Sequence, residues 1–148
     1  MRLTTFTDYS LRVLMFVAIA PEGRATIGEV ARSFGISEHH LVKVVHALGK
    51  AGLLENTRGR GGGLRLAVPA ASIRVGQVVR STEGGDIPAE CFERDSNTCT
   101  IARVCRLKNV LAEAVEAFYK ALDRYTLADL VSNRTKLAAI LHFRTAAA

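Results

Sequence analysis

The sequence predicts a mainly α-helical protein: a winged helix-turn-helix with a small β-hairpin as its wing, followed by a long helix. Three observations support this fold class. Two short helical patterns within residues 26–51 flank a glycine turn, a glycine-rich hairpin pattern follows them, and apolar residues recur at alternating steps of four and three over residues 107–125. The length of 148 residues suits one domain, or one small domain with an appendage.

Composition and charge favour a soluble protein with a polyanionic partner. Hydrophobic residues make up 49% and charged residues 23%, which is ordinary for a globular protein. Residues 1–80 carry 11 Lys and Arg against 5 Asp and Glu, whereas residues 81–148 carry 9 of each. A basic first half favours nucleic acid as the partner, although a basic surface that only confers solubility has the same charge.

No segment indicates a membrane or an exported protein. The longest apolar run, Val13–Ala20, is too short to span a bilayer, and the N-terminus lacks the basic start and unbroken apolar core of a signal peptide. We therefore expect a cytoplasmic protein without a membrane partner and with reduced thiols. Clustered cysteines in that compartment bind metal or do redox chemistry more often than they form disulfides.

The first predicted helix runs from Thr7 or Asp8 to Ala20 and is ended by Pro21. It is apolar on most sides and should be buried. The stretch "TIGE" at residues 26–29 fits a capping box, in which Thr26 caps a helix and Glu29 reaches back to it. This short helix should end near residue 34.

Gly35 then permits a sharp turn, Ser37 can cap the next helix, and Gly52 can end it. At 100° per residue this second helix has two faces. The apolar face carries Leu41, Val44, Val45 and Leu48, and the opposite face carries His39, Lys43, His46 and Lys50. The polar face is free to enter a DNA major groove; a solvated surface helix is the alternative interpretation.

The wing is predicted from two short strands, Leu53–Asn56 and Leu64–Val68, that flank "TRGRGGG". Arginines at a glycine-rich tip suit phosphates or the narrow minor groove. A nucleotide-binding glycine loop is the rival interpretation, but the Walker lysine and the strand-loop-helix context are absent. The candidate DNA-binding residues are Thr26, Ser37, Glu38, His39, His40, Lys43, His46, Lys50, Arg58 and Arg60.

Two more helical patterns follow the wing. "SIRVGQVVRSTEG" after Pro69 reads as a helix, and a long helix is predicted from Cys105 to about Tyr125. The apolar positions of the long helix form a seam: Leu107, Leu111, Ala114, Phe118, Ala121 and Tyr125. A helix of about 21 residues spans roughly 31 Å, which is long for a domain of this size. We interpret it as a dimer helix that also packs on its own subunit, with a core helix of a monomer as the alternative.

A twofold dimer suits DNA binding, because paired recognition helices can read the half-sites of a palindromic operator. "TLAD" at residues 126–129 has the sequence of a capped start of a last helix. The expected organisation is a winged helix-turn-helix domain over residues 1–80, a cysteine-bearing loop over 81–106, and the dimerisation helix with the C-terminal helix over 107–148.

All three cysteines of the chain lie within fifteen residues, at Cys91, Cys99 and Cys105. Neither the tight pair of a structural zinc site nor a thioredoxin-type C-x-x-C is present. The segment is polar, and nearby positive charge would favour thiolates and offset a negative cluster; it comes from Arg94, Arg103, Arg106 and Lys108. An iron–sulfur cluster with three thiolates and one other ligand fits these features, while a zinc site and a thiol redox switch stay open.

Several motifs together resemble the iron–sulfur winged-helix regulator family. They are "LTTFTDYSLRVL", the helix-turn-helix, "RGRGGGLRLA", the three cysteines and "TLADLV", and they cover nearly the whole chain. "FTDYSLR" and "YTLADLV" with the cysteines point to the nitric-oxide-sensing repressors of this family. The resemblance implies a homodimer whose cluster permits DNA binding and whose reaction with nitric oxide releases the operator.

The resemblance also implies the missing ligand. It assigns Asp8 of the partner subunit as the fourth ligand of a [4Fe-4S] cluster, with [2Fe-2S] as the alternative cluster. An acid in the first helical turn is also favoured by the helix dipole alone. A carboxylate is a harder and weaker iron ligand than a thiolate, which would leave one iron more open to a diatomic molecule. Arg12, one turn later, can pair with Asp8 and orient it. The gap between Cys91 and Cys99 is longer than the spacing typical of the family.

Other function classes fit less well. The sequence has no substrate-binding signature and no paired-carboxylate or Ser/His/Asp arrangement, so we do not expect an enzyme. The nearest alternative is a related iron–sulfur or thiol-based regulator that senses cluster supply or redox state. A module that binds no DNA is a further alternative, which a salt-dependent DNA-binding assay would distinguish.

Overall fold

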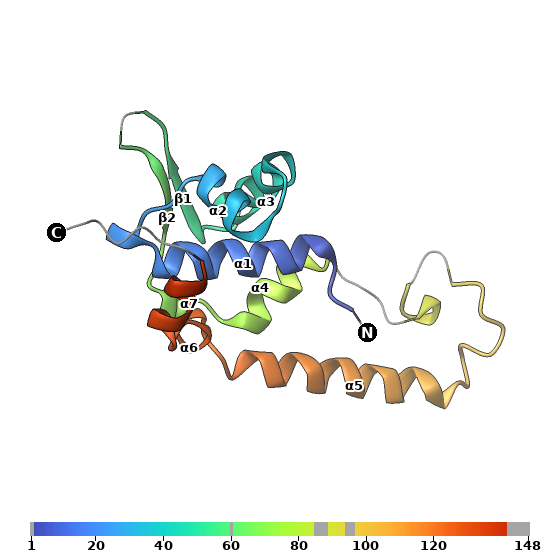
Figure 1. Ribbon diagram of the computed structural model, residues 1–148. Coiled ribbons are helices and arrows are strands. Elements are labelled where there is room, and N and C mark those ends of the chain that lie inside the picture. Colours follow the sequence, from blue (N-terminus) through green and yellow to red (C-terminus); the bar gives the residue numbers. More distant parts are fainter. Residues whose placement is uncertain (1, 60, 85–88, 94–96, 142–148) are drawn as a thin grey trace.

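Figure 1 shows the computed structural model of the chain, which describes residues 2–59, 61–84, 89–93 and 97–141. The candidate DNA contact Arg60 and the loop residue Arg94 lie outside the described residues.

The elements in chain order are α1 (Thr5–Ile19), η1 (Pro21–Gly23), α2 (Ile27–Phe34), α3 (Glu38–Lys50), β1 (Leu54–Thr57), β2 (Gly63–Leu66), η2 (Ala70–Ser72), α4 (Val75–Thr82), η3 (Glu90–Phe92), α5 (Arg106–Asp123), α6 (Leu127–Leu130) and α7 (Arg134–Ile140). Among the described residues, one two-stranded antiparallel sheet accompanies the helices, which confirms the predicted fold class. None of the described helices has the length and apolar character that crossing a bilayer requires.

Helix α1 is the centre of the core. It contacts α3, α4, α6 and α7, and four of its apolar side chains are at most 2% exposed: Val13, Leu14, Phe16 and Val17. The prediction that this helix is buried is therefore confirmed. It begins at Thr5, slightly earlier than expected, because the Thr4 hydroxyl accepts a hydrogen bond from the Thr7 N–H at 3.2 Å and so caps the helix.

The helix-turn-helix forms from local signals. Thr26 and Glu29 make the expected capping box, and Gly35 takes the left-handed conformation with φ 64°. The Ser37 hydroxyl caps α3 by accepting from the His40 N–H at 3.4 Å. These three features set the angle between α2 and α3 and confirm the predicted motif.

The wing strands are displaced by one or two residues from the prediction. Leu54 pairs with Leu66 and Thr57 pairs with Gly63. Leu53 lies outside the sheet because its N–H donates to the Leu48 carbonyl at 3.0 Å and ends α3, with Gly52 left-handed at φ 70°. A bridge between Ala25 and Leu64 attaches the wing to the segment before α2.

The C-terminal segment returns to the first half of the chain. Leu127 and Leu141 are 1% and 8% exposed and belong to the same core as α1. Thr126 and Asp129 form the expected capping box, but α6 ends after four residues and a second helix, α7, which the sequence did not predict, follows. Helix α7 begins at Arg134, whose guanidinium donates to the Ile19 carbonyl at the end of α1 at 3.1 Å.

Helix α5 packs on the winged helix at its C-terminal end. Its C-terminal end packs on α4, and the segment after it pairs with the start of α4 through a bridge between Arg74 and Thr126. The other end extends away from the winged helix toward the cysteine-bearing segment (Figure 1). No residue of α5 is buried, so it is not the core helix of a monomer.

Candidate functional site

The three cysteines lie on the segment that leads into α5. Cys91 is in η3, Cys99 is in an irregular stretch, and Cys105 is the residue before the first turn of α5. All three are free thiols and are partly exposed. The Cys105 side chain makes no capping hydrogen bond to α5.

Contacts of neighbouring residues shape this segment. Glu90 Oε1 accepts hydrogen bonds from the Thr98 N–H and, at 2.6 Å, from the Thr98 hydroxyl. The pKa of the Glu90 carboxyl lies below its usual value, chiefly because of the Thr98 hydroxyl and then because of the Thr98 N–H. The Lys108 ammonium lies 5.6 Å from the centroid of the Phe92 ring. Both contacts join residues that flank different cysteines.

The donor chemistry fits an iron–sulfur cluster, since three unpaired thiols share one segment with cationic neighbours. Within the part of the chain that the structure describes, no three His, Cys, Asp or Glu side chains come together closely enough to hold a metal ion. The structure therefore does not bring Asp8 to the cysteines of its own chain.

Asp8 instead lies in the first turns of α1 and pairs with Arg12. The Arg12 Nε and Nη2 atoms lie 3.1 and 2.8 Å from the two carboxylate oxygens, and both side chains are more than 40% exposed. The predicted pairing of the two residues is thus present. The Arg12 guanidinium also lies 5.7 Å from the centroid of Phe34 at the end of α2, which links Asp8 to the helix-turn-helix.

A second link at this end of α1 involves residues that the sequence analysis missed. Glu83, which is 8% exposed, accepts from the Thr4 N–H and hydroxyl at 2.9 and 3.1 Å and joins α4 to the start of α1. Tyr9 lies beside His40 of α3, with 6.4 Å between the ring centroids. Partners so far apart in the chain leave no periodic signal in the sequence.

The candidate DNA interface is built on α3. The apolar residues Leu41, Val44, Val45 and Leu48 are at most 5% exposed, and the opposite face is exposed, as the angular analysis predicts; this face carries His39, Lys43, His46 and Lys50. Glu38 and His40 are also exposed at the start of the helix. The hydroxyls of Thr26 and Ser37 cap α2 and α3, so their exposed side chains have a structural role there.

The wing adds further positive charge. Arg58 is exposed at the tip of the hairpin. Two other arginines, not predicted as part of the site, join the wing to the segment before α2: Arg24 donates to the Gly62 carbonyl at 3.2 Å, and Arg65 donates to the Glu22 carbonyl at 2.9 Å. Their guanidinium groups stabilise the position of the wing relative to α2.

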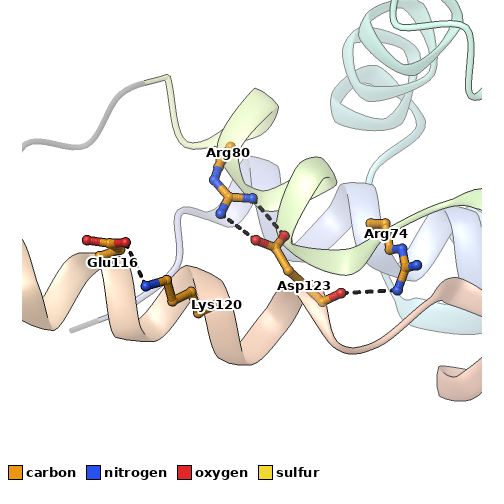
Figure 2. Close-up of polar contacts among 5 residues, drawn as sticks. All are labelled: Arg74, Arg80, Glu116, Lys120 and Asp123. Atoms are coloured by element: carbon orange, nitrogen blue, oxygen red, sulfur yellow. Dashed lines mark hydrogen bonds and ion pairs between the residues drawn. The ribbon is translucent and has the colours of Figure 1, made fainter.

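The junction of α4 and α5 connects the winged helix to the helix that follows the cysteine-bearing segment (Figure 2). Arg80 binds Asp123 through two hydrogen bonds, and the Arg80 guanidinium lies 4.5 Å from the centroid of Tyr119. Arg74 donates to the Asp123 carbonyl at 3.3 Å. The two hydrogen bonds between Arg80 and Asp123 hold the pKa of the Asp123 carboxyl below its usual value. The same bonds raise the pKa of the Arg80 guanidinium above its usual value.

A model of the Rrf2 family, described as "Iron-dependent Transcriptional regulator", matches residues 3–133. Three relatives are named HTH-type transcriptional regulator NsrR. The protein of Shouchella clausii is 47% identical and covers 98% of both chains. Those of Geobacillus kaustophilus and Bacillus subtilis are 49% and 46% identical, and each match covers 97% of this chain and 99% of the relative.

Solved structures with the same fold include two named regulators. The oxidized form of Staphylococcus aureus CymR has a TM-score of 0.67 and 27% identity, covering 88% of this chain and 95% of that one. The structure of T. potens IscR has a TM-score of 0.71 and 25% identity, covering 90% of this chain and 88% of that one.

Proposed function

The chain belongs to the Rrf2 family of transcriptional regulators and is of the NsrR type, and from that premise we propose that an iron–sulfur cluster which reacts with nitric oxide controls its binding to operator DNA. The relatives are named regulators of transcription, so the chain is a DNA-binding repressor and not an enzyme, as the sequence predicts. The reduced thiols that this function needs suit the cytoplasm.

One observation carries the proposal: three unpaired thiols lie on the segment at the free end of α5, and the other end of that helix is bound to α4. A change at the thiols can therefore act through α5 on the position of the winged helix. Cys91, Cys99 and Cys105 would hold the cluster, with Asp8 of the partner subunit as the fourth ligand. When bound, the cluster would supply iron that reacts with nitric oxide. We propose a [4Fe-4S] cluster, with a [2Fe-2S] cluster as the alternative.

The residues around Asp8 offer a route to the recognition helix. A carboxylate that binds iron can no longer give both oxygens to Arg12, whose guanidinium also lies against Phe34 of α2. Tyr9, the next residue, lies beside His40 of α3. Loss of the cluster would return the Asp8 carboxylate to Arg12. The contacts of Arg12 with Phe34 and of Tyr9 with His40 would then shift. Such an element, with two states that a ligand biases, supplies a coupling free energy between cluster and DNA.

The proposal includes a homodimer on a palindromic operator. The exposed apolar side chains of α5 include Leu107 and Val110, at 60% and 59% exposed, and Ile101 and Val104 just before the helix are exposed as well. In this arrangement residues 1–80 bind DNA, residues 81–106 hold the cluster, and residues 107–148 join the subunits. Two recognition helices related by a twofold axis would read two half-sites.

The alternative function is a regulator that senses cluster supply or redox state through the thiols. The three free cysteines support it, and one similar structure is an oxidized form of CymR. In that case oxidants and loss of the cluster would change DNA affinity more than nitric oxide does.

Anaerobic purification with iron and sulfide analysis tests the proposal, followed by DNA titration before and after stoichiometric nitric oxide. The DNA is an operator selected from a random pool with the cluster-loaded protein. We expect iron and sulfide in the purified protein and loss of operator binding after nitric oxide. Equal affinity before and after nitric oxide in cluster-loaded protein would contradict the sensing function.

A further inference from the structure

We propose that Glu90 and Thr98 form a clasp that holds Cys91 and Cys99 in position for the cluster before the cluster is inserted. The clasp joins the residue immediately before Cys91 to the residue immediately before Cys99. It therefore accounts for the wide gap between these two cysteines. The inference rests on the proposed cluster and names positioning residues that none of the sequence motifs contains.

The clasp is a two-point contact. One carboxylate oxygen of Glu90 accepts from the backbone N–H and from the hydroxyl of Thr98. A charged acceptor makes such hydrogen bonds stronger than those between neutral groups. Because one of the two donors belongs to the backbone, the contact fixes the main chain at Thr98 as well as its side chain.

Helix capping does not explain this contact. The same two-point contact between a threonine and an acid occurs at Thr26 with Glu29 and at Thr126 with Asp129, where the threonine precedes a helix and the acid follows three residues later. Thr98 precedes no helix, and its acid lies eight residues earlier in the chain. The contact therefore closes a loop between two cysteines.

The backbone of Cys99 is also held while its thiol stays free. The Cys99 N–H donates to Asn97 Oδ1 at 3.1 Å, and the Cys99 carbonyl accepts from the Ala102 N–H at 3.2 Å. Phe92, directly after Cys91, lies against Lys108 in the first turn of α5, next to Cys105. Contacts of neighbouring residues thus restrict the main chain around Cys91 and Cys99, which lowers the loop entropy lost when the thiols bind one cluster.

The first test measures how closely the two thiols are held without any iron. In apo protein with the Cys105→Ser substitution, only Cys91 and Cys99 can form an internal disulfide. Equilibration with reduced and oxidised glutathione transfers two electrons from the two thiols to one glutathione disulfide, which becomes two glutathione thiols. Mass spectrometry after alkylation of the remaining thiols measures the ratio of disulfide to dithiol protein. Together with the known glutathione concentrations, this ratio gives the effective concentration of the Cys91 thiol at Cys99.

Thr98→Val is expected to lower this effective concentration about threefold to tenfold, the effect of losing one such hydrogen bond. Glu90→Ala should lower it at least as much, because it removes the acceptor of both hydrogen bonds. Thr100→Val is the matched control on the other side of Cys99, and Glu113→Ala removes an exposed carboxylate from α5. Glu90→Gln keeps an acceptor oxygen but has no charge, and it should keep most of the wild-type effective concentration. This variant distinguishes the positioning role of Glu90 from an effect of its negative charge. Thermal midpoints within experimental error of the wild type would establish that the fold is intact.

The second test uses the natural cysteines. Protein loaded anaerobically with iron and sulfide is exposed to an iron chelator, and the rate of cluster loss is followed by absorbance. Glu90→Ala and Thr98→Val should lose the cluster about threefold to tenfold faster than Thr100→Val and Glu113→Ala. Equal thiol pairing and equal rates of cluster loss in the clasp and control variants would overturn the clasp. A wild-type protein that takes up no cluster would instead overturn the proposed function, and the thiol-pairing test would still decide whether the clasp holds Cys91 and Cys99 together.

Discussion

Arg80 and Asp123 join the winged helix to α5 through a two-point ion pair, with Nη1 2.7 Å from Oδ1 and Nη2 2.6 Å from Oδ2 (Figure 2). The two residues belong to α4 and to the last turn of α5. They lie where α5 packs on α4. A movement of α5 can reach the winged helix through this junction.

Gly76→Ala is expected to weaken this junction. A Cβ at Gly76 would lie 3.0 Å from the Asp123 backbone nitrogen and closer still to the carboxylate. We expect the free energy of unfolding in urea to fall by about 1–3 kcal/mol, the usual effect of overpacking. Gly49→Ala is the matched control, because its Cβ would meet only an ordinary 3.8 Å contact and should stabilise α3 by up to about 1 kcal/mol. Equal effects of the two substitutions would show that α4 and α5 do not pack closely at Gly76.

Stability should depend on pH through Asp123. Its folded-state pKa is lowered by Arg80, so its contribution is present above the unfolded pKa of about 3.9 and is lost as pH falls through the lower folded value. The stability difference between wild type and Asp123→Asn should therefore be largest near neutral pH and should shrink in acid. Urea unfolding of both proteins at several pH values measures it. A difference that does not change with pH would mean that the ion pair contributes nothing to stability.

Lys43→Ala should weaken binding to all DNA sequences, because one phosphate contact is lost. The plot of log K for DNA binding against log salt concentration should become shallower by about one unit of slope. Lys43 lies on the exposed face of α3. Titrations with labelled operator at four salt concentrations give the slope. Lys136→Ala removes an exposed lysine from α7 and serves as the control. The same slope in both variants would place Lys43 outside the interface.

Leu107→Glu should shift the protein toward monomers, because it places a charge among the apolar side chains at the free end of α5. We expect the dimer dissociation constant, measured by sedimentation equilibrium, to rise at least about tenfold. Ile140→Glu is the matched control, since Ile140 is 70% exposed on α7. An unchanged association state in Leu107→Glu would argue against a dimer through this end of α5.

Asp8→Ala should change the absorption spectrum of the loaded protein and its rate of reaction with nitric oxide, and iron should be lost at least about tenfold faster. The exposed polar side chains of α3 are not altered by this change. Glu55→Ala, which removes an exposed carboxylate from β1, is the control. An unchanged spectrum together with an unchanged rate would exclude Asp8 as a ligand.

Elements whose signals are local follow directly from short stretches of the amino-acid sequence. The capping box of Thr26 and Glu29, the glycine turn at Gly35 and the two faces of α3 all depend on residues within four positions of each other, and the structure has them as predicted. Hydrogen bonds and side-chain spacing repeat within one helical turn, so a single stretch of sequence encodes them.

Contacts between residues far apart in the chain follow from the folded arrangement of the helices and not from local sequence signals. Arg80 and Asp123 are 43 positions apart, Thr4 and Glu83 are 79 apart, and Leu141 enters a core built mainly from the first half of the chain. The sequence also placed the start of β1 one residue too early, because the Leu53 N–H is used to end α3. Such contacts depend on how the chain returns on itself, and two charged or apolar residues far apart in sequence carry no mark of the partner that packing will bring to them.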